Sequence, residues 1–275
     1  MSKHREDSIA IRRFKTKIKE ILHPVLLLGV HLFSKCKVRI VGDYNIPANT
    51  NVIFAVNHSN SFDFPVSARV VKRHFIILAD ATLQEDPAVN LLNRLNGCVY
   101  VDRKERQSRA VSKRKILDYL SDGKNILLFP EGTWNLHPCR LMLPLNWGII
   151  DLSKTANVPI VPIVMEYHER TAYVKIGEAY MPAGDKLTEI KCLTDKMATM
   201  KWDLIHMLPS LSRNDLPDDY FETYVQSCLD GYRRFDLEYE TSVIRKEYDT
   251  YDEVYEHLKY IHPTMQNAFL FNKRL

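Results

Sequence analysis

A histidine and an aspartate lie five positions apart in the segment His58-Ser-Asn-Ser-Phe-Asp63, shortly after the apolar run 52–56. Five helical residues rotate a side chain by about 140°, and strand positions alternate between faces, so neither regular structure brings the two groups together. The serines and the asparagine between them favour a turn, which does. Asp63 can then accept the proton of one ring nitrogen and leave the other basic toward a substrate hydroxyl. The spacing therefore predicts His58 as a general base and Asp63 as its orienting acid.

Three later segments contain short apolar runs, and two of these runs end in functional groups. The run Ile126-Leu-Leu-Phe129 leads into Pro130-Glu-Gly-Thr133, a tight turn that carries a carboxylate. Between this turn and His58 lies Gly97-Cys-Val-Tyr-Val-Asp-Arg103, a predicted strand that ends in a charge pair. The last segment, Val158-Pro-Ile-Val-Pro-Ile-Val164, is rich in β-branched residues and interrupted by prolines. The chain thus contains four blocks, each built on a predicted strand.

These four blocks, in this order and at these separations, resemble the glycerolipid acyltransferase family, whose members acylate glycerol-3-phosphate, lysophosphatidate and related lysolipids. The resemblance covers roughly residues 40 to 180. It is carried mainly by the first block, Asn57-His58 through Asp63, together with the third, Phe129-Pro-Glu-Gly-Thr133. The other two blocks support it by their placement, and the chain is identified as a member of this family.

The resemblance implies an O-acyltransferase that moves a fatty acyl group from acyl-CoA or acyl carrier protein to a hydroxyl of a lysophospholipid, with lysophosphatidate as the default acceptor. An imidazole can take the hydroxyl proton near neutral pH, so no metal and no other cofactor is expected. Asp63 would fix the tautomer of His58 and stabilise the imidazolium. By resemblance, Glu131, Gly132 and Thr133 shape the acceptor pocket. Backbone N–H groups of Gly132 or Thr133 are candidate donors to the oxyanion.

The acceptor head group is less well defined by these residues. By resemblance, Arg103 contacts an acceptor phosphate, a role that suits a guanidinium fork. Many family members carry an arginine and a serine after the threonine of the third block, where this chain has Trp134-Asn135. Many also carry a lysine where this chain has Asn146. With fewer cations, an acceptor with a phosphodiester or without phosphate, such as another lysolipid or a glycolipid, is the alternative.

Each of these residues also has a purely structural interpretation. His58 could be a hydrogen-bonded loop residue, and Asp63 could cap a helix that begins at Phe64-Pro65. Glu131 could be a solvated turn carboxylate, and Arg103 could begin an exposed basic helix. For the whole protein, the competing class is a membrane lipid-binding protein without turnover. Nucleic-acid binding is not expected, because the basic stretches lack interleaved aromatic residues and a recognition helix.

Apolar runs alternate with helical patterns along the chain, which predicts an α/β fold with a mostly parallel sheet flanked by helices. In such sheets, sites form at the carboxyl ends of strands, and His58, Arg103 and Glu131 each follow a predicted strand end. The predicted strands are 52–56, 75–79, 98–101, 126–129, 160–164 and 173–176, and the predicted helices are 87–95, 105–121 and 147–156.

Charge and hydropathy divide the chain into three parts. Residues 1–40 hold ten Lys and Arg against three Asp and Glu. Their apolar run 21–33 is shorter than a membrane span of about twenty residues and lacks a signal-peptide cleavage site. We therefore expect a basic N-terminal helix that lies on an anionic membrane surface, with packing on the core as the alternative. The acyltransferase α/β core follows at 41–182, and a C-terminal helical extension at 183–275 is expected to pack on it.

Length and composition fit one enzyme domain with these additions. The 275 residues are 45% hydrophobic and 26% charged, with a formal net charge of +4, which are ordinary values for a globular protein. The five cysteines show no C-x-x-C pair and no metal-ligand spacing, as is typical of reduced thiols in a cytosol. We expect a peripheral protein at the cytoplasmic face of a membrane, and the sequence carries no signal for an oligomeric state.

Overall fold

The computed structural model describes residues 3–33, 36–136, 140–209, 217–220, 223 and 226. The strands are β1 (Lys37–Ile40), β2 (Ile53–Val56), β3 (Phe75–Asp80), β4 (Cys98–Val101), β5 (Asn125–Leu128), β6 (Ile160–His168) and β7 (Thr171–Ile176). The helices are α1 (Lys3–Phe33), α2 (Asp63–Val71), α3 (Pro87–Asn96), α4 (Arg106–Ser121), α5 (Gly148–Ala156) and α6 (Lys186–Met207), with a 3-10 helix η1 (Ala81–Glu85).

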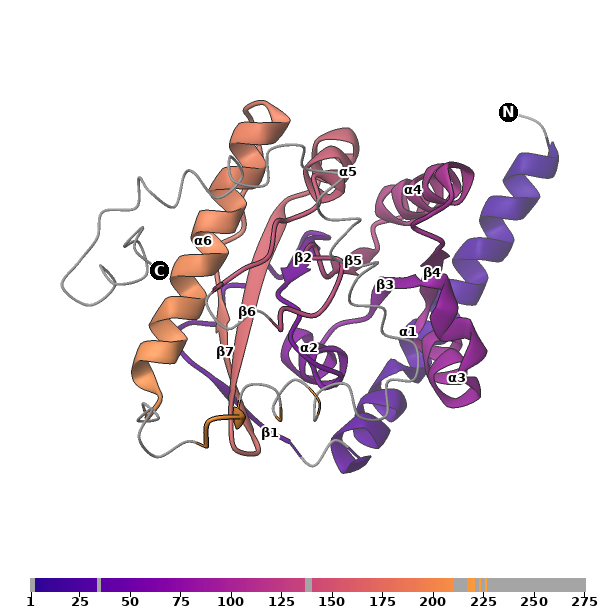
Figure 1. The fold of residues 1–275 in the computed structure, drawn as a ribbon. Coiled ribbons are helices and arrows are strands. Elements are labelled where there is room, and N and C mark those ends of the chain that lie inside the picture. The colour runs from indigo at the N-terminus through magenta and orange to yellow at the C-terminus, as the bar shows by residue number, and fades with distance from the viewer. Residues whose placement is uncertain are drawn as a thin grey trace.

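The strands form one seven-stranded sheet in the order β1-β7-β6-β2-β5-β3-β4 (Figure 1). Neighbouring strands are parallel, except for the antiparallel pair β6 and β7. This arrangement confirms the predicted α/β fold with a mostly parallel sheet. Because β2, β3, β4, β5 and β6 all run in one direction, their carboxyl ends lie along the same edge of the sheet.

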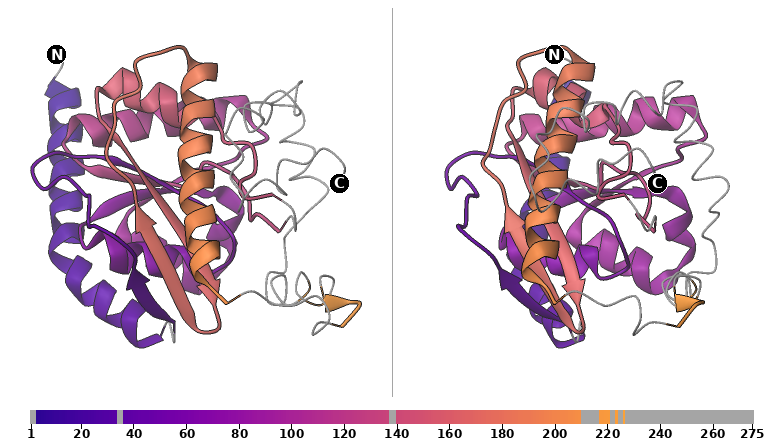
Figure 2. Two further views of the ribbon diagram at one scale, coloured as in Figure 1. Left: turned by 90° about the vertical axis from the view of Figure 1, so that its left-hand side faces the viewer. Right: turned by 60° about the vertical axis from the view of Figure 1, so that its left-hand side comes forward.

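Apolar side chains fill both faces of the sheet. On β2, Ile53 and Ala55 pack on one face, and Phe54 and Val56 pack on the other, which is the alternation of a strand covered on both sides. Helices α4, α5 and α6 cover the first face. Helix α2 covers the second face, with α1 and α3 beside it (Figures 1 and 2).

The six predicted strands and the three predicted helices all occur, with ends that differ by a few residues. The largest difference is in β6, which continues to His168, four residues beyond its predicted end. Strand β1 is not among the predicted elements, and helix α2 was predicted only within the alternative interpretation of Asp63. Strand β1 has four residues that alternate between basic and apolar, and its partner β7 lies far along the chain. Its pairing therefore leaves no strong local signal.

The predicted N-terminal segment 1–40 contains two kinds of structure. Helix α1 has 31 residues and continues through Pro24, so it includes the apolar run 21–33 and extends well before it. Strand β1 also lies in this segment but belongs to the sheet, so the sheet begins before the predicted boundary at residue 40. No helix in the described part of the chain is both long enough and apolar enough to cross a membrane.

The predicted C-terminal extension begins with α6, which packs along β6 and β7. Leu193 and Met197 of this helix are buried in the core. Packing of the extension on the core is thus observed for its first helix. Nearly all of 210–275, including most of the tyrosine-rich stretch, lies outside the described residues.

Ion pairs connect helix α1 to the C-terminal end of α4. Arg12 lies 2.7 Å from Asp122 and 3.0 Å from Asp118, and Arg13 lies 2.8 Å from Asp122. The side chain of Asp122 is only 4% exposed, so these arginines replace the water that its charge would otherwise attract. About two turns further along α1, Glu20 pairs with Lys124 at 2.6 Å. The basic residues of α1 thus partly serve to attach the helix to the core.

Replacing Asp122 tests this attachment. Asp122→Asn removes the shared negative charge and leaves Arg13 without its partner, so we expect the free energy of unfolding to fall by about 1–2 kcal/mol in urea denaturation. Lys17→Ala is the matched control, because Lys17 is 70% exposed and its pair with Glu20 spans 3.7 Å. Exposed pairs of this kind contribute less than about 0.5 kcal/mol. Equal losses in the two variants would contradict the proposed attachment.

Candidate active site

The predicted site residues gather at the carboxyl edge of the sheet. Strands β2, β4 and β5 end on this edge, and His58, Arg103 and Glu131 follow them directly. Direct hydrogen bonds connect these segments, since Glu131 bonds to the backbone of His58 and Arg103 bonds to the carbonyl of Gly132. The parallel sheet therefore brings together blocks that are far apart in the sequence.

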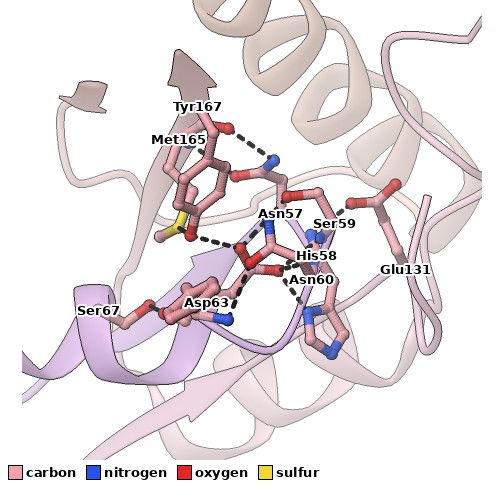
Figure 3. A network of polar contacts seen from close by, with 10 residues as sticks. Asn57, His58, Ser59, Asn60, Asp63, Ser67, Glu131, Met165 and Tyr167 are labelled. Carbon is pink, nitrogen blue, oxygen red and sulfur yellow. Dashed lines mark hydrogen bonds and ion pairs between the residues drawn. The ribbon is translucent and has the colours of Figure 1, made fainter. Parts of the chain in front are cut away.

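The turn after β2 joins His58 to Asp63. The Nδ1 atom of His58 lies 2.7 Å from Oδ2 of Asp63 (Figure 3). The backbone N–H groups of Ser59 and Asn60 donate to the same oxygen at 2.5 and 2.9 Å. In a neutral imidazole whose Nδ1 donates to this carboxylate, Nε2 is the basic nitrogen. The predicted contact between the two residues is present.

The Asp63 carboxylate is fully buried at the start of α2. Phe62 occupies the N-cap position, and no side chain caps the helix. The capping interpretation of Asp63 is therefore wrong, because its carboxylate receives N–H groups that precede the helix. The second oxygen, Oδ1, accepts the phenol O–H of Tyr167 at 2.7 Å and the hydroxyl of Ser59 at 3.3 Å. These donors take the place of water around a buried charge.

Aromatic rings orient the His58 imidazole. Phe129 stacks on it with ring centroids 4.1 Å apart and an interplanar angle of 18°, and Trp134 meets it edge to face at 6.0 Å. The Nε2 atom points away from Asp63 (Figure 3) and has no hydrogen-bond partner among the described residues. The side chain is 22% exposed. His58 is thus a fixed ring with one nitrogen engaged by Asp63 and one nitrogen without a hydrogen-bond partner in the described part of the chain.

Glu131 ties the turn after β5 to the turn after β2. Its Oε1 accepts the N–H of His58 at 2.8 Å, and its Oε2 accepts the N–H of Leu143 at 2.8 Å. The residue is 2% exposed, so the interpretation as a solvated turn carboxylate is wrong. These contacts fix the backbone of His58. Contact of Glu131 with an acceptor stays a prediction.

Burial raises the pKa of Glu131 to about 7, from an ordinary value of 4.5, because a charge is poorly solvated inside a protein. The ammonium of Lys201 and the two backbone N–H groups oppose this shift. Lys201 is buried on α6, with Nζ 3.6 Å from Oε2 of Glu166. Lys201 was not among the predicted site residues, because no local sequence pattern connects this lysine with the distant turn that holds Glu131.

Gly132 and Thr133 complete the turn after β5. Gly132 has a φ of +74°, in the left-handed region that favours glycine. Its N–H donates to the carbonyl of Phe129 at 3.0 Å, so this group is already engaged within the turn. For Thr133, neither the buried hydroxyl nor the N–H has a hydrogen-bond partner in the described part of the chain. Thr133 is therefore the better oxyanion candidate, and substrate contact by either residue stays a prediction.

Arg103 connects three segments at the edge of the site. Its Nε donates to Oδ2 of Asp80 at 2.8 Å, and its Nη1 donates to the carbonyl of Gly132 at 2.6 Å. Asp80 is itself held by the N–H and hydroxyl of Thr82, at 2.9 and 2.8 Å. Arg103 is thus anchored beside the turn that carries Glu131 and does not simply begin an exposed helix. A phosphate contact stays a prediction.

Both asparagines that depart from the family pattern hold backbone groups. The backbone N–H of Asn135 donates to the carbonyl of His58 at 2.7 Å. Its side-chain amide donates to the carbonyls of Arg140 and Leu141, at 3.0 and 3.2 Å. Asn146 accepts the N–H of Gly148 at 2.8 Å, at the start of α5. Asn135 therefore fixes a loop next to His58, and Asn146 fixes the start of α5, and neither adds positive charge.

Asn57 and Tyr167 contribute to the site although neither was predicted to. The amide of Asn57 makes two hydrogen bonds with the backbone of Met165, at 3.0 and 2.7 Å. Tyr167 reaches Asp63 from the same strand, β6. Both contacts join residues more than a hundred positions apart, so the sequence shows the polar side chains but not their partners.

Metal ligands do not gather in the described part of the chain, where no group of three or more His, Cys, Asp or Glu side chains could hold a metal ion. Free thiols occur at Cys36, Cys98 and Cys192. Burial raises the pKa of each, to about 12 for Cys98. A raised pKa makes these three thiols less acidic than a free cysteine, which does not favour a nucleophilic role.

The segment that carries most of these site residues is similar to known proteins. The Acyltransferase family model matches residues 37–166. The 1-acyl-sn-glycerol-3-phosphate acyltransferase of Borreliella burgdorferi is 33% identical over 139 residues, which are 50% of this chain and 54% of that protein. The protein of the same name from Saccharomyces cerevisiae is 29% identical over 141 residues, 51% of this chain and 46% of its own length. The chain thus spans about half the length of the curated relatives it matches.

The fold also has a counterpart among solved structures. The crystal structure of the 1-acyl-sn-glycerophosphate (LPA) acyltransferase PlsC from Thermotoga maritima matches with a TM-score of 0.58 and 20% identity, over 75% of this chain and 91% of that chain. At this identity the likeness shows a shared fold. His58, Asp63, Arg103 and Glu131 lie within the segment that matches the family model, and Lys201 lies outside it.

The raised pKa of Glu131 predicts a pH-dependent contribution to stability. Its folded pKa of about 7 exceeds the ordinary 4.5, so the folded state holds an extra proton between these values. This contribution is fully present below about pH 4.5 and is lost as the pH rises through 7. We expect the free energy of unfolding of the wild type, minus that of Glu131→Gln, to fall by about 2–3 kcal/mol between pH 4.5 and 8.

Urea denaturation of both proteins at several pH values measures this difference. Glu178→Gln, at an exposed carboxylate, is the matched control for loss of one negative charge. A wild-type minus Glu131→Gln difference that stays constant from pH 4.5 to 8 would be incompatible with a raised pKa at this position.

Proposed function

We propose that this chain belongs to the glycerolipid acyltransferase family through residues 37–166, which match the Acyltransferase family model, and that it is an O-acyltransferase that moves a fatty acyl group from a thioester to a hydroxyl of a lysolipid. The observation that carries this proposal is the state of His58. Its Nδ1 is held 2.7 Å from the buried Asp63 carboxylate, and its Nε2 has no partner among the described residues. His58 and Asp63 correspond to the histidine and the aspartate of a catalytic triad, and the substrate hydroxyl takes the place of the serine.

In the proposed reaction, the acceptor hydroxyl donates a hydrogen bond to Nε2 of His58. As its oxygen attacks the carbonyl carbon of the thioester, the proton moves to Nε2, and Asp63 stabilises the imidazolium. The N–H of Thr133 is the candidate donor to the oxyanion. The carbon–sulfur bond then breaks, and His58 returns the proton to the leaving thiolate. One ester replaces one thioester, so this scheme uses no metal and no other cofactor.

Lysophosphatidate is the acceptor we propose first, with acyl-CoA or acyl carrier protein as the donor. The relatives from Borreliella burgdorferi and Saccharomyces cerevisiae are named 1-acyl-sn-glycerol-3-phosphate acyltransferases. Arg103, anchored by Asp80 and by the carbonyl of Gly132, is the cation proposed to meet the acceptor phosphate. The turn of Glu131, Gly132 and Thr133 is proposed to form one side of the acceptor pocket.

Two neutral positions support a second class of acceptor. Trp134 and Asn146 stand where many family members carry an arginine and a lysine. Trp134 packs edge to face on the His58 ring, and Asn146 accepts the backbone N–H of Gly148. An acceptor with a phosphodiester or with no phosphate, such as another lysolipid or a glycolipid, needs fewer cations than a phosphate monoester. Acceptors of both classes should therefore be compared in the same assay of acyl transfer.

Release of free thiol from acyl-CoA or acyl carrier protein, with a panel of lysolipid acceptors, tests the proposed transfer. We expect acceptor-dependent release by the wild type that falls by a factor of about a hundred or more in His58→Ala, since the base is lost. His206→Ala, at an exposed position on α6, is the matched control and should keep its activity.

Each outcome of this experiment assigns either a class of acceptor or a function without turnover. Release that is fastest with lysophosphatidate supports the first acceptor, and release that is fastest with a phosphodiester lysolipid or a glycolipid supports the second class. If no combination exceeds the rate of His58→Ala while the protein still binds lipid vesicles, a lipid-binding protein without turnover is the better assignment.

We further propose that α1 holds the protein at the cytoplasmic face of a membrane, as a peripheral protein. Apolar side chains recur along its outer side at helical spacing, and each is 42% to 69% exposed. We call these residues the α1 stripe: Ile11, Phe14, Ile18, Ile21, Leu22, Val25 and Leu28. Exposed Arg13, Lys15 and Lys17 lie in the same stretch. An apolar stripe accompanied by cations favours binding in the plane of an anionic lipid surface.

Charges placed in the α1 stripe should weaken vesicle binding. Phe14 and Val25 are 68% and 69% exposed, so Phe14→Glu with Val25→Glu should not disturb the core. We expect at least about tenfold weaker co-sedimentation with phosphatidylglycerol vesicles, because two apolar contacts are lost and two negative charges are added. Met207→Glu, at a 62% exposed position on α6, is the matched control. Unchanged vesicle binding by the double variant would exclude the α1 stripe as the membrane surface.

A further inference from the structure

Tyr167 reaches the Asp63 carboxylate from β6. Its phenol O–H donates to Oδ1 of Asp63 at 2.7 Å, while Oδ2 is engaged with His58 and with the backbone of the turn (Figure 3). Tyr167 lies one position beyond the segment 37–166 that matches the family model. Tyr167 therefore lies outside the four sequence blocks, and the fold brings it to the Asp63 carboxylate of the first block.

Strand β6 is held in register with the turn after β2. The two strands pair in parallel, and the amide of Asn57 extends this pairing by two hydrogen bonds with the backbone of Met165. Tyr167 follows Met165 by two residues and so lies on the same side of the strand. The Tyr167 hydroxyl is also 3.2 Å from the Met165 sulfur. These contacts fix the position of the phenol relative to Asp63.

The phenol remains protonated and acts as a donor. Burial, together with the charge and the hydrogen bond of Asp63, raises the pKa of Tyr167 far above its ordinary range. Cys36 and Glu166 also face the phenol, and negative charge on either acts in the same direction. On the other side of Asp63 lie the His58 ring and the Glu131 carboxylate.

We propose that Tyr167 is a positioning residue for the acyl transfer, whose O–H holds Oδ1 of Asp63 and thereby keeps Oδ2 aligned with Nδ1 of His58. This inference rests on the proposed function and deepens it. The other donor to Oδ1 within the described residues is the hydroxyl of Ser59, and its bond of 3.3 Å is too long to replace the phenol. The phenol also takes up part of the carboxylate charge, which limits how strongly Asp63 stabilises an imidazolium.

Tyr167→Phe removes the O–H and keeps the ring. We expect kcat to fall about tenfold, with little change in the KM for the acceptor, because alignment of the base changes and substrate contacts do not. The acid limb of the pH profile of kcat/KM should move up by about half a unit, since Asp63 then stabilises the imidazolium more strongly. Tyr180→Phe is the matched control, because the Tyr180 hydroxyl is buried without a partner in the described part of the chain.

Two further measurements separate positioning from general stability. In the Asp63→Asn background, adding Tyr167→Phe should leave kcat unchanged if the phenol acts through the carboxylate, as a double-mutant cycle would show. NMR titration of the His58 ring needs no turnover, and its midpoint should also move up by about half a unit in Tyr167→Phe. Urea denaturation of Tyr167→Phe establishes that the variant is folded in these experiments.

The outcomes distinguish this inference from the proposed function. A folded Tyr167→Phe protein with the kcat, the pH profile and the His58 titration of the wild type would overturn the role of Tyr167 and leave the transferase intact. A wild type without thiol release would overturn the proposed function, and the His58 titration would then still decide whether Tyr167 acts on Asp63. Should Tyr167→Phe fail to fold, the phenol proton of Tyr167 in the wild type is the second test. An O–H held 2.7 Å from Oδ1 of Asp63 should resonate downfield of a free phenol, and an unshifted phenol proton would overturn the inference.

Discussion

Burial of the Asp63 carboxylate is the constraint on which this site depends. The side chain has no exposure to solvent, and a carboxylate so placed stays ionised only when protein donors replace water. The His58 ring, two backbone N–H groups of the turn and the Tyr167 hydroxyl supply these donors. The turn after β2, the start of α2 and the end of β6 must therefore form together for the charge to be tolerated.

A second buried carboxylate extends the same constraint across the sheet. Glu131 uses both oxygens to hold backbone N–H groups, one of them at His58, so the base is fixed through its ring and through its main chain. Two carboxylates near one another are costly, and Asp63 adds to the raised pKa of Glu131. Lys201 offsets part of this cost from α6, which lies beyond the segment that matches the family model. The C-terminal helix thus takes part in the electrostatics of the site.

Sequence patterns were informative where the physical cause is local. Apolar runs predicted the buried strands, and turn-forming residues between His58 and Asp63 predicted their contact, because each signal lies within a few residues. Strand β1 was missed because its four residues depend on pairing with distant β7. Tyr167 was missed for a similar reason, since a tyrosine near a strand end carries no mark of the carboxylate it will meet. Burial, which gives Glu131 its pKa, likewise depends on the whole fold.

The charges around His58 bear on which acceptor the site can hold. Arg103 is paired with Asp80, and Lys201 lies 3.6 Å from Glu166, so each of these cations already faces a carboxylate. If Arg103 makes the proposed contact with the acceptor, a phosphate monoester shares this cation with Asp80, whereas a singly charged phosphodiester gives up less solvation for the same contact. The neutral amide of Asn135 adds no charge, since it holds loop carbonyls. In the proposed acyl transfer, the charge of the acceptor head group is thus the property on which the pair of Arg103 and Asp80 acts.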